Sequence, residues 1–136
     1  MLNPKFARTN TPLGQAYIQK KLYSKAIEAF SKLPMTTFDL GSNGLIYIAF
    51  TYAASGNLSA AKSFFNKVSK EDLDTAPYVA ACYYAQVGDI DNALSQIEHA
   101  YQIHNLPMIH IKHEPLLDPL RNEPRFKAVL RKMNLD

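Results

Sequence analysis

The sequence predicts an all-α protein, a helical solenoid of three helix–turn–helix repeats closed by a C-terminal helix. Two observations carry this prediction. The stretch from Tyr84 to Ala93 holds an aromatic residue, a glycine, an aspartate and an alanine at fixed spacing, and similar patterns occur twice upstream. The aligned alanines, Ala26, Ala61 and Ala93, lie 61 − 26 = 35 and 93 − 61 = 32 residues apart. Self-similarity at such a period, with two helices per unit, is typical of a helical solenoid.

The repeated alanine has a clear role in packing. It lets the second helix of a repeat approach the first closely, whereas a leucine there would overpack the contact at a cost of about 1–3 kcal/mol. Four residues later, a large apolar residue lies on the same helix face and is expected to fill the core. These core residues are Phe30, Phe65 and Ile97.

The turn between the two helices of a repeat is also encoded. Gly56 and Gly88 suit the left-handed conformation that ends a helix, and Asn57 and Asp89 suit the N-cap of the next one. Lys21 replaces this glycine in the first repeat. We therefore expect the first turn to be either built differently or mildly strained.

Apolar periodicity, turn residues and prolines place the individual elements. Thr11 is the expected N-cap of the first helix, with Pro12 in its first turn and residues 1–10 as a loosely held tail. Residues 71–75 are expected to form a polar turn, and three prolines leave room only for short turns in residues 105–123. The helices are expected at about residues 12–20, 23–32, 42–55, 58–69, 77–87, 91–104 and 124–133.

These patterns resemble the tetratricopeptide repeat (TPR) family, although the chain lacks the tryptophan that often begins such a repeat. The resemblance implies a right-handed solenoid and a single domain over residues 1–136. It divides the chain into repeats at about 7–38, 42–73 and 74–105, followed by a linker and capping helix at 106–136. The residues that carry it are Gly14, Tyr17, Ala26 and Phe30, then Ala49, Tyr52, Gly56, Ala61 and Phe65, then Ala81, Tyr84, Gly88, Ala93 and Ile97.

The C-terminal run from Asp118 to Met133 is similar to the tail that closes TPR segments in many bacterial regulatory proteins. Phe126 begins an apolar stripe in this run, and basic residues occupy the other face, as expected of a cap. In those families the TPR segment follows a DNA-binding, kinase or cyclase domain, and this sequence holds no such domain. The similarity therefore implies a sensor or scaffold module of a bacterial regulatory or signalling system, without catalytic activity.

Composition sets further bounds. The chain has 136 residues, is 47% hydrophobic and carries a formal net charge of +3, which is too mild to indicate nucleic acid. The charge is uneven, with six Lys/Arg against two Asp/Glu in residues 1–40 and three against six in residues 41–100. No apolar run spans a membrane and no signal peptide is evident, so a cytoplasmic location is expected. The alternative is a soluble domain of a longer membrane-bound or periplasmic regulator.

Catalytic, metal and cofactor sites are not predicted. His110, His113 and Glu114 could supply metal ligands, but they do not follow the spacing of a zinc hydrolase and Pro115 interrupts a helix there. We favour solvated or capping histidines. The lone cysteine, Cys82, is expected to be a small buried or groove-lining residue, because no nearby basic group would activate it.

The resemblance also implies a binding groove, because the first helix of each TPR lines the concave face. This groove would be aromatic and amide-bearing, with almost no charge. It suits a peptide with apolar anchors better than an acidic C-terminal peptide, since the lysine clamp of chaperone-binding relatives is missing. The residues implied to line it are Gln15, Gln19, Asn43, Tyr47, Phe50, Tyr78, Cys82 and Gln86.

Three hypotheses for the function follow. The leading one is a protein-binding adaptor whose partner is a protein or peptide. The alternative is a self-associating structural module that forms a homodimer through the groove face. Separately, the groove could be filled by the chain's own tail or cap, or by a second copy, and so bind no partner. An RNA-binding repeat is the third, and the neutral to acidic middle of the chain disfavours it. The oligomeric state of the purified chain discriminates between the first two.

Overall fold

The computed structural model describes residues 4–33 and 44–135, and no strand occurs in these two ranges. The all-α prediction is therefore confirmed. The chain divides into two compact units, Met1–Ala76 and Pro77–Asp136, which are described in turn. In the described residues, no helix is both long enough and apolar enough to cross a membrane.

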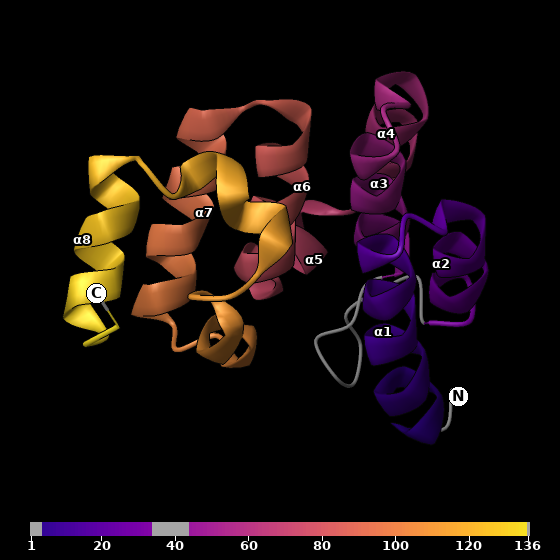
Figure 1. The fold of residues 1–136 in the computed structure, drawn as a ribbon, viewed down its shortest axis with the longest axis horizontal. Coiled ribbons are helices and arrows are strands. Elements are labelled where there is room, and N and C mark those ends of the chain that lie inside the picture. The colour runs from indigo at the N-terminus through magenta and orange to yellow at the C-terminus, as the bar shows by residue number, and fades with distance from the viewer. Residues whose placement is uncertain (1–3, 34–43, 136) are drawn as a thin grey trace. The chain divides into compact units, whose positions relative to one another are not determined.

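The first unit contains two antiparallel helix pairs. Helix α1 packs against α2, α2 packs against α3, and α3 packs against α4 (Figure 1). The pairs α1–α2 and α3–α4 are the helix–turn–helix units that the sequence predicts. The helices of this unit are α1 (Pro4–Gln19), α2 (Tyr23–Phe30), α3 (Gly44–Ala54), α4 (Leu58–Phe65) and the short α5 (Lys70–Thr75).

An aromatic cluster joins the two helix pairs of the first unit. The ring of Phe30 on α2 lies 5.0 Å from that of Tyr47 and 5.9 Å from that of Phe50, both on α3. On the other side, a Cβ atom at Gly14 of α1 would overlap the Phe30 ring. The glycine is therefore required for α1 to approach α2 at this ring, a close contact that a larger side chain would prevent.

The second unit contains a third helix pair and a C-terminal extension. Helix α6 (Pro77–Val87) packs against α7 (Ile90–Gln102), and α8 (Pro124–Lys132) packs against α7 (Figure 1). Between them, the 3₁₀ helix η1 (Leu106–His110) contacts α6, and η2 (Pro115–Leu120) contacts both α6 and α7. The bounds of α6, α7 and α8 agree with the predicted helices within two residues, which is the usual uncertainty of helix ends.

The same turn closes the first helix of all three pairs. Lys21, Gly56 and Gly88 have φ values of 60°, 92° and 85°, in the left-handed region. The next residue then donates its N–H to the carbonyl five residues earlier, over 2.8 Å for Leu22, and 2.9 Å for Asn57 and Asp89. This is the Schellman arrangement. Lys21 thus adopts the glycine-type turn itself, and the first turn is strained and not built differently.

The predicted core and caps are also in place. Ala26, Ala61 and Ala93 are fully buried, and Phe30, Phe65 and Ile97 are buried beside them. The side chains of Asn57 and Asp89 accept the backbone N–H three residues on, at 3.1 and 3.3 Å. Leu22, at the same position of the first pair, makes no side-chain cap.

Three predictions about the elements are wrong. Helix α4 ends at Phe65, four residues before the predicted end at residue 69. Helix α1 begins at Pro4 and not at Pro12, which lies inside the helix. Pro12 lacks an N–H and so costs one backbone hydrogen bond, which this helix tolerates. Residues 71–75 belong to α5 and are not a turn. Ser69 caps α5 by accepting the N–H of Asp72 over 3.2 Å, and two acidic residues in its first turn complement the helix dipole.

The short turns predicted for residues 105–123 are the two 3₁₀ helices, and Arg121 holds them together. Its guanidinium donates to the carbonyls of Ile111 and Glu114, at 3.3 and 2.7 Å, and to the carboxylate of Asp118, at 2.8 Å. It also lies over the Phe126 ring, 5.6 Å from the centroid. A single side chain therefore ties η1 and η2 to the start of α8.

Candidate functional site

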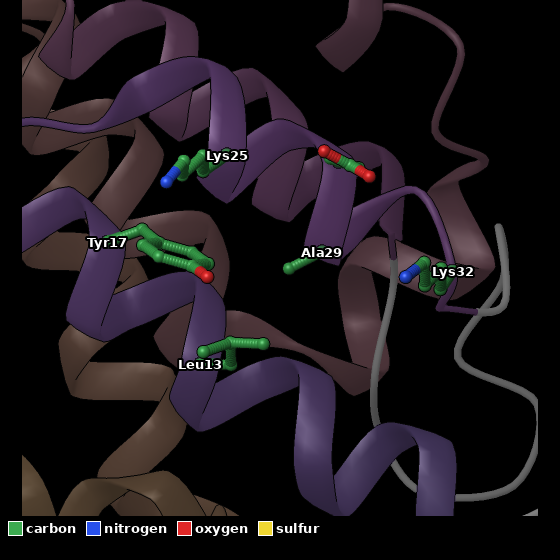
Figure 2. A pocket seen from close by; sticks show the side chains of 6 residues that line it. Leu13, Tyr17, Lys25, Ala29 and Lys32 are labelled. Atoms are coloured by element: carbon green, nitrogen blue, oxygen red, sulfur yellow. The ribbon is translucent and has the colours of Figure 1, made fainter.

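An open pocket lies on the α1–α2 pair of the first unit. It has a volume of about 170 Å³. Figure 2 shows Leu13 and Tyr17 on α1 facing Ala29 on α2, with Lys25 to one side and Lys32 beyond Ala29. Glu28 completes the lining. Leu13 is 40% exposed, so the floor of the pocket offers apolar surface to solvent.

The charged side chains that line this pocket are Lys25, Lys32 and Glu28, which gives the lining a net positive charge. The Lys25 ammonium lies over the Tyr17 ring, 5.9 Å from its centroid. Residues 4–33 hold six Lys/Arg and a single acidic residue, Glu28. The pocket therefore combines an aromatic and aliphatic floor with a cationic rim, an arrangement that suits a ligand with an apolar part and negative charge beside it.

A second pocket of about 340 Å³ lies between α7 and α8 in the second unit, lined by Glu98, Tyr101, Gln102, Val129 and Lys132. An ion pair dominates this face, with Arg125 Nε donating to Glu98 Oε2 over 3.1 Å. The hydrogen bond from Arg125 lowers the pKa of Glu98. Since Glu98 is paired with Arg125, and the Lys132 ammonium lies over the Tyr101 ring, 5.8 Å from its centroid, the charged groups of this pocket already have partners within the chain.

The groove residues predicted on α3 belong to the core. Tyr47 is 6% exposed and Phe50 is 1% exposed, and their rings lie 5.2 Å apart in the cluster with Phe30. They do not line an open surface, because the same apolar character that suggested a groove also suits burial. On α1, Gln15 is partly exposed and Gln19 is exposed. Asn43 lies outside the described residues.

The groove residues predicted on α6 are covered as well. Tyr78 and Cys82 are 3% and 2% exposed. Gln86 donates from Nε2 to the Leu116 carbonyl over 2.8 Å, so the chain's own η2 helix occupies this amide. Burial raises the pKa of the Cys82 thiol well above its ordinary value, and the Glu114 carboxylate raises it further. The thiol is therefore protonated and inert at neutral pH.

The histidines do not assemble a metal site. In residues 4–33 and 44–135, no three His, Cys, Asp or Glu side chains lie close enough together to hold an ion. His110 and His113 are exposed, and His104 takes the left-handed position after α7, with a φ of 55°. Glu114 turns inward, where its carboxylate accepts the Leu116 N–H over 3.2 Å.

Comparison with known families supplies the context for the first pocket. Residues 7–33 match the family model of the tetratricopeptide repeat. This segment of the chain is a tetratricopeptide repeat, and the two later helix pairs repeat its sequence pattern. Neither the curated proteins nor the solved structures gave a match. The matched repeat consists of α1 and α2, so the pocket lies on the TPR that the family model recognises. The hand of the solenoid remains a prediction.

The sequence analysis missed the pocket of the first TPR because it considered only the positions that define the repeat pattern. A signal was present at a variable one. When the first two TPRs are aligned on Ala26 and Ala61, Ala29 is equivalent to Phe64, and Tyr17 is equivalent to Tyr52. Both repeats have a tyrosine at one position, but the first has a small residue where the second has a phenylalanine. This difference indicates space in the first TPR that a side chain fills in the second.

Proposed function

We propose that this chain is a protein-binding module that acts without catalysis, and that the first TPR holds its contact surface. TPRs generally mediate protein–protein interaction. The observation that carries the proposal is the open pocket of the first TPR, with its apolar floor and cationic rim. The buried state of Tyr47 and Phe50 directs the proposal to this surface and away from an aromatic groove on α3.

The C-terminal tail adds a biological setting to the proposal. Its similarity to the tails that close TPR segments of bacterial regulatory proteins supports a role as a scaffold or sensor in a regulatory system, located in the cytoplasm. In this proposal η1, η2 and α8 end the repeat array. Gln86 on α6 holds η2 on the last helix pair by donating to the Leu116 carbonyl, and Arg121 holds the extension together by donating to the carbonyls of Ile111 and Glu114.

A capture experiment with two charge-reversal variants tests the proposed function. Lysate of the source organism is passed over the immobilised native chain, over Lys25→Glu/Lys32→Glu, and over Lys112→Glu/Lys127→Glu as the matched control. All four lysines are exposed, so each variant is expected to fold. We expect a protein that the native chain and the control capture and that the first variant loses. Capture of nothing, or equal capture by all three, contradicts the proposal.

A further inference from the structure

The second TPR shows what fills the space that is open in the first. On α3 and α4, the rings of Tyr52 and Phe64 are stacked, with centroids 5.4 Å apart and planes 19° apart. The Lys67 ammonium then lies over the Phe64 ring, 4.9 Å from its centroid. These three side chains form a layered stack of a tyrosine, a phenylalanine and a cation.

The first TPR has the residues of the two outer layers at the corresponding sequence positions and lacks the phenylalanine of the middle layer. At the same offset of 35 residues, Tyr17 corresponds to Tyr52 and Lys32 to Lys67, but Ala29 stands where the second TPR has Phe64. All three side chains line the open pocket (Figure 2). The third TPR has Gln96 at this position, so the first is the one repeat with a small residue there.

The size and chemistry of the gap suit an aromatic ring. An engineered apolar cavity of about 150 Å³ in another protein takes up benzene, and the pocket here measures about 170 Å³. A ring placed over Ala29 would stack on Tyr17 and receive the Lys32 ammonium on its other side. Stacked aromatic pairs and cation–π contacts are both favourable in partly desolvated sites.

The surroundings of the pocket indicate what should flank that ring. Lys25 and Lys32 are exposed at the rim, and Glu28 is the single acidic residue in residues 4–33. A partner with acidic residues next to its aromatic residue would complement this surface, whereas a basic partner would be repelled.

We propose that the pocket of the first TPR binds an aromatic side chain of a partner protein, presented by a segment with acidic residues on both sides. The partner's ring takes the place that Phe64 has in the second TPR. This inference rests on the proposed protein-binding function and adds the chemical class of the bound segment.

A fluorescence-anisotropy titration tests the inference with a defined probe. The probe is a fluorescein-labelled, end-capped peptide Asp-Glu-Phe-Glu-Asp, and the controls replace its Phe by Ala or its acidic residues by Lys. We expect the native chain to bind the probe at least about tenfold more tightly than either control, since a tenfold change needs only about 1.4 kcal/mol. Equal binding of the Phe and Ala peptides would overturn the inference.

Two variants connect the binding to the pocket. Ala29→Phe fills the space with the chain's own ring, as in the second TPR, and is expected to weaken binding of the probe at least about tenfold while the fold is kept. Tyr17→Ala removes the stacking partner and serves as the second variant if Ala29→Phe does not fold, as judged by circular dichroism. Lys127→Ala is the control and should bind like the native chain. Unchanged binding by a folded pocket variant would overturn the inference.

The two proposals fail in different ways. If a lysate protein is captured equally by the native chain and Ala29→Phe, but is lost with Lys25→Glu/Lys32→Glu, the proposed function holds and the aromatic anchor is overturned. If no protein is captured and no peptide binds, both are overturned. If the native chain forms a dimer that Ala29→Phe abolishes, the occupant is a second copy, and the partner proposed here is overturned.

Discussion

Lys21 has a backbone conformation that is unfavourable for any residue with a side chain. It holds a φ of 60° in a turn where the other two TPRs have glycine. A non-glycine residue in this conformation costs roughly 1–2 kcal/mol. We predict that Lys21→Gly increases the free energy of unfolding by about 1 kcal/mol, somewhat less than that cost because glycine also gains freedom in the unfolded chain. Urea unfolding followed by circular dichroism measures this difference.

Gly88→Lys provides the reverse experiment at the matching position of the third TPR. Its φ of 85° and the open space around its Cα leave the backbone conformation as the main cost. We expect this variant to lose about 1 kcal/mol or more. If Lys21→Gly fails to stabilise the chain while Gly88→Lys destabilises it, the first turn is not strained.

Glu114 carries a residue-scale prediction about pH. Burial raises the pKa of its carboxyl, although the hydrogen bond from the Leu116 N–H acts in the opposite direction. The folded chain therefore holds this proton at a pH at which the unfolded chain has lost it. The stability contributed by this group is complete below the ordinary glutamate pKa, and it is lost as the pH rises through the raised value.

Glu114→Gln tests this dependence, because glutamine keeps an oxygen that accepts the Leu116 N–H and does not ionise. We predict that the free energy of unfolding of the glutamine variant, relative to the native chain, increases as the pH rises from about 4 to about 7. Chemical unfolding at a series of pH values measures the difference. A difference that stays constant over this range would contradict the raised pKa.

At the scale of elements, the sequence predicted what each repeat encodes locally. The alanine, the glycine turn and the Asn57 and Asp89 caps depend on neighbouring residues, and all occur as expected. The start of α1 was mispredicted because proline favours a first turn but does not require one. The buried positions of Tyr47 and Phe50 depend on contacts with Phe30, and apolar character alone does not separate core from binding surface.

The candidate site was harder to predict than the fold for a related reason. The pocket of the first TPR is lined by the small, buried Ala29 together with Tyr17. Its significance appears only when Tyr52 and Phe64 are seen stacked in the second TPR. A position that varies between repeats has little weight in a repeat pattern, so pattern reasoning passes over it.

The 3₁₀ elements supply the prediction at this scale. Arg121 joins η1, η2 and α8 through two backbone carbonyls, one carboxylate and one ring. Its side chain is 29% exposed, so these contacts are only partly screened by solvent. Hydrogen bonds to a charged group contribute about 1.5–3 kcal/mol, and we predict that Arg121→Ala lowers the free energy of unfolding by about 2 kcal/mol.

Arg121→Lys separates the charge of this residue from its geometry. A lysine cannot reproduce the planar fork that reaches two carbonyls at once, so we expect it to recover less than half of the loss. Thermal unfolding and hydrogen exchange of the amides in residues 111–120 provide the two measurements. If Arg121→Ala changes neither, the segment is held by its buried apolar residues, such as Leu117 and Leu120, and by the Gln86–Leu116 hydrogen bond.

The described residues of the predicted groove face offer little surface for pairing. Tyr47, Phe50, Tyr78 and Cys82 are buried, and Gln86 already donates to the Leu116 carbonyl. In the described part of the chain, the large apolar residues that are exposed lie on different elements or in turns. They are Leu13, Leu22, Leu58, Ile103 and Ile109. Scattered apolar residues of this kind are ordinary on a monomer's surface.

We therefore predict that the purified chain sediments as a monomer of 15.3 kDa at a concentration of about 10 μM, and that added acidic Phe peptide binds it without changing its oligomeric state. Analytical ultracentrifugation with and without the peptide measures both. The basic first TPR and the acidic residues 41–100 are the features that could join two copies head to tail. A dimer that dissociates when the salt concentration is raised would indicate that charge contact, because screening weakens exposed ion pairs. A dimer that resists salt would require a buried apolar interface, and it would contradict the monomeric surface described above.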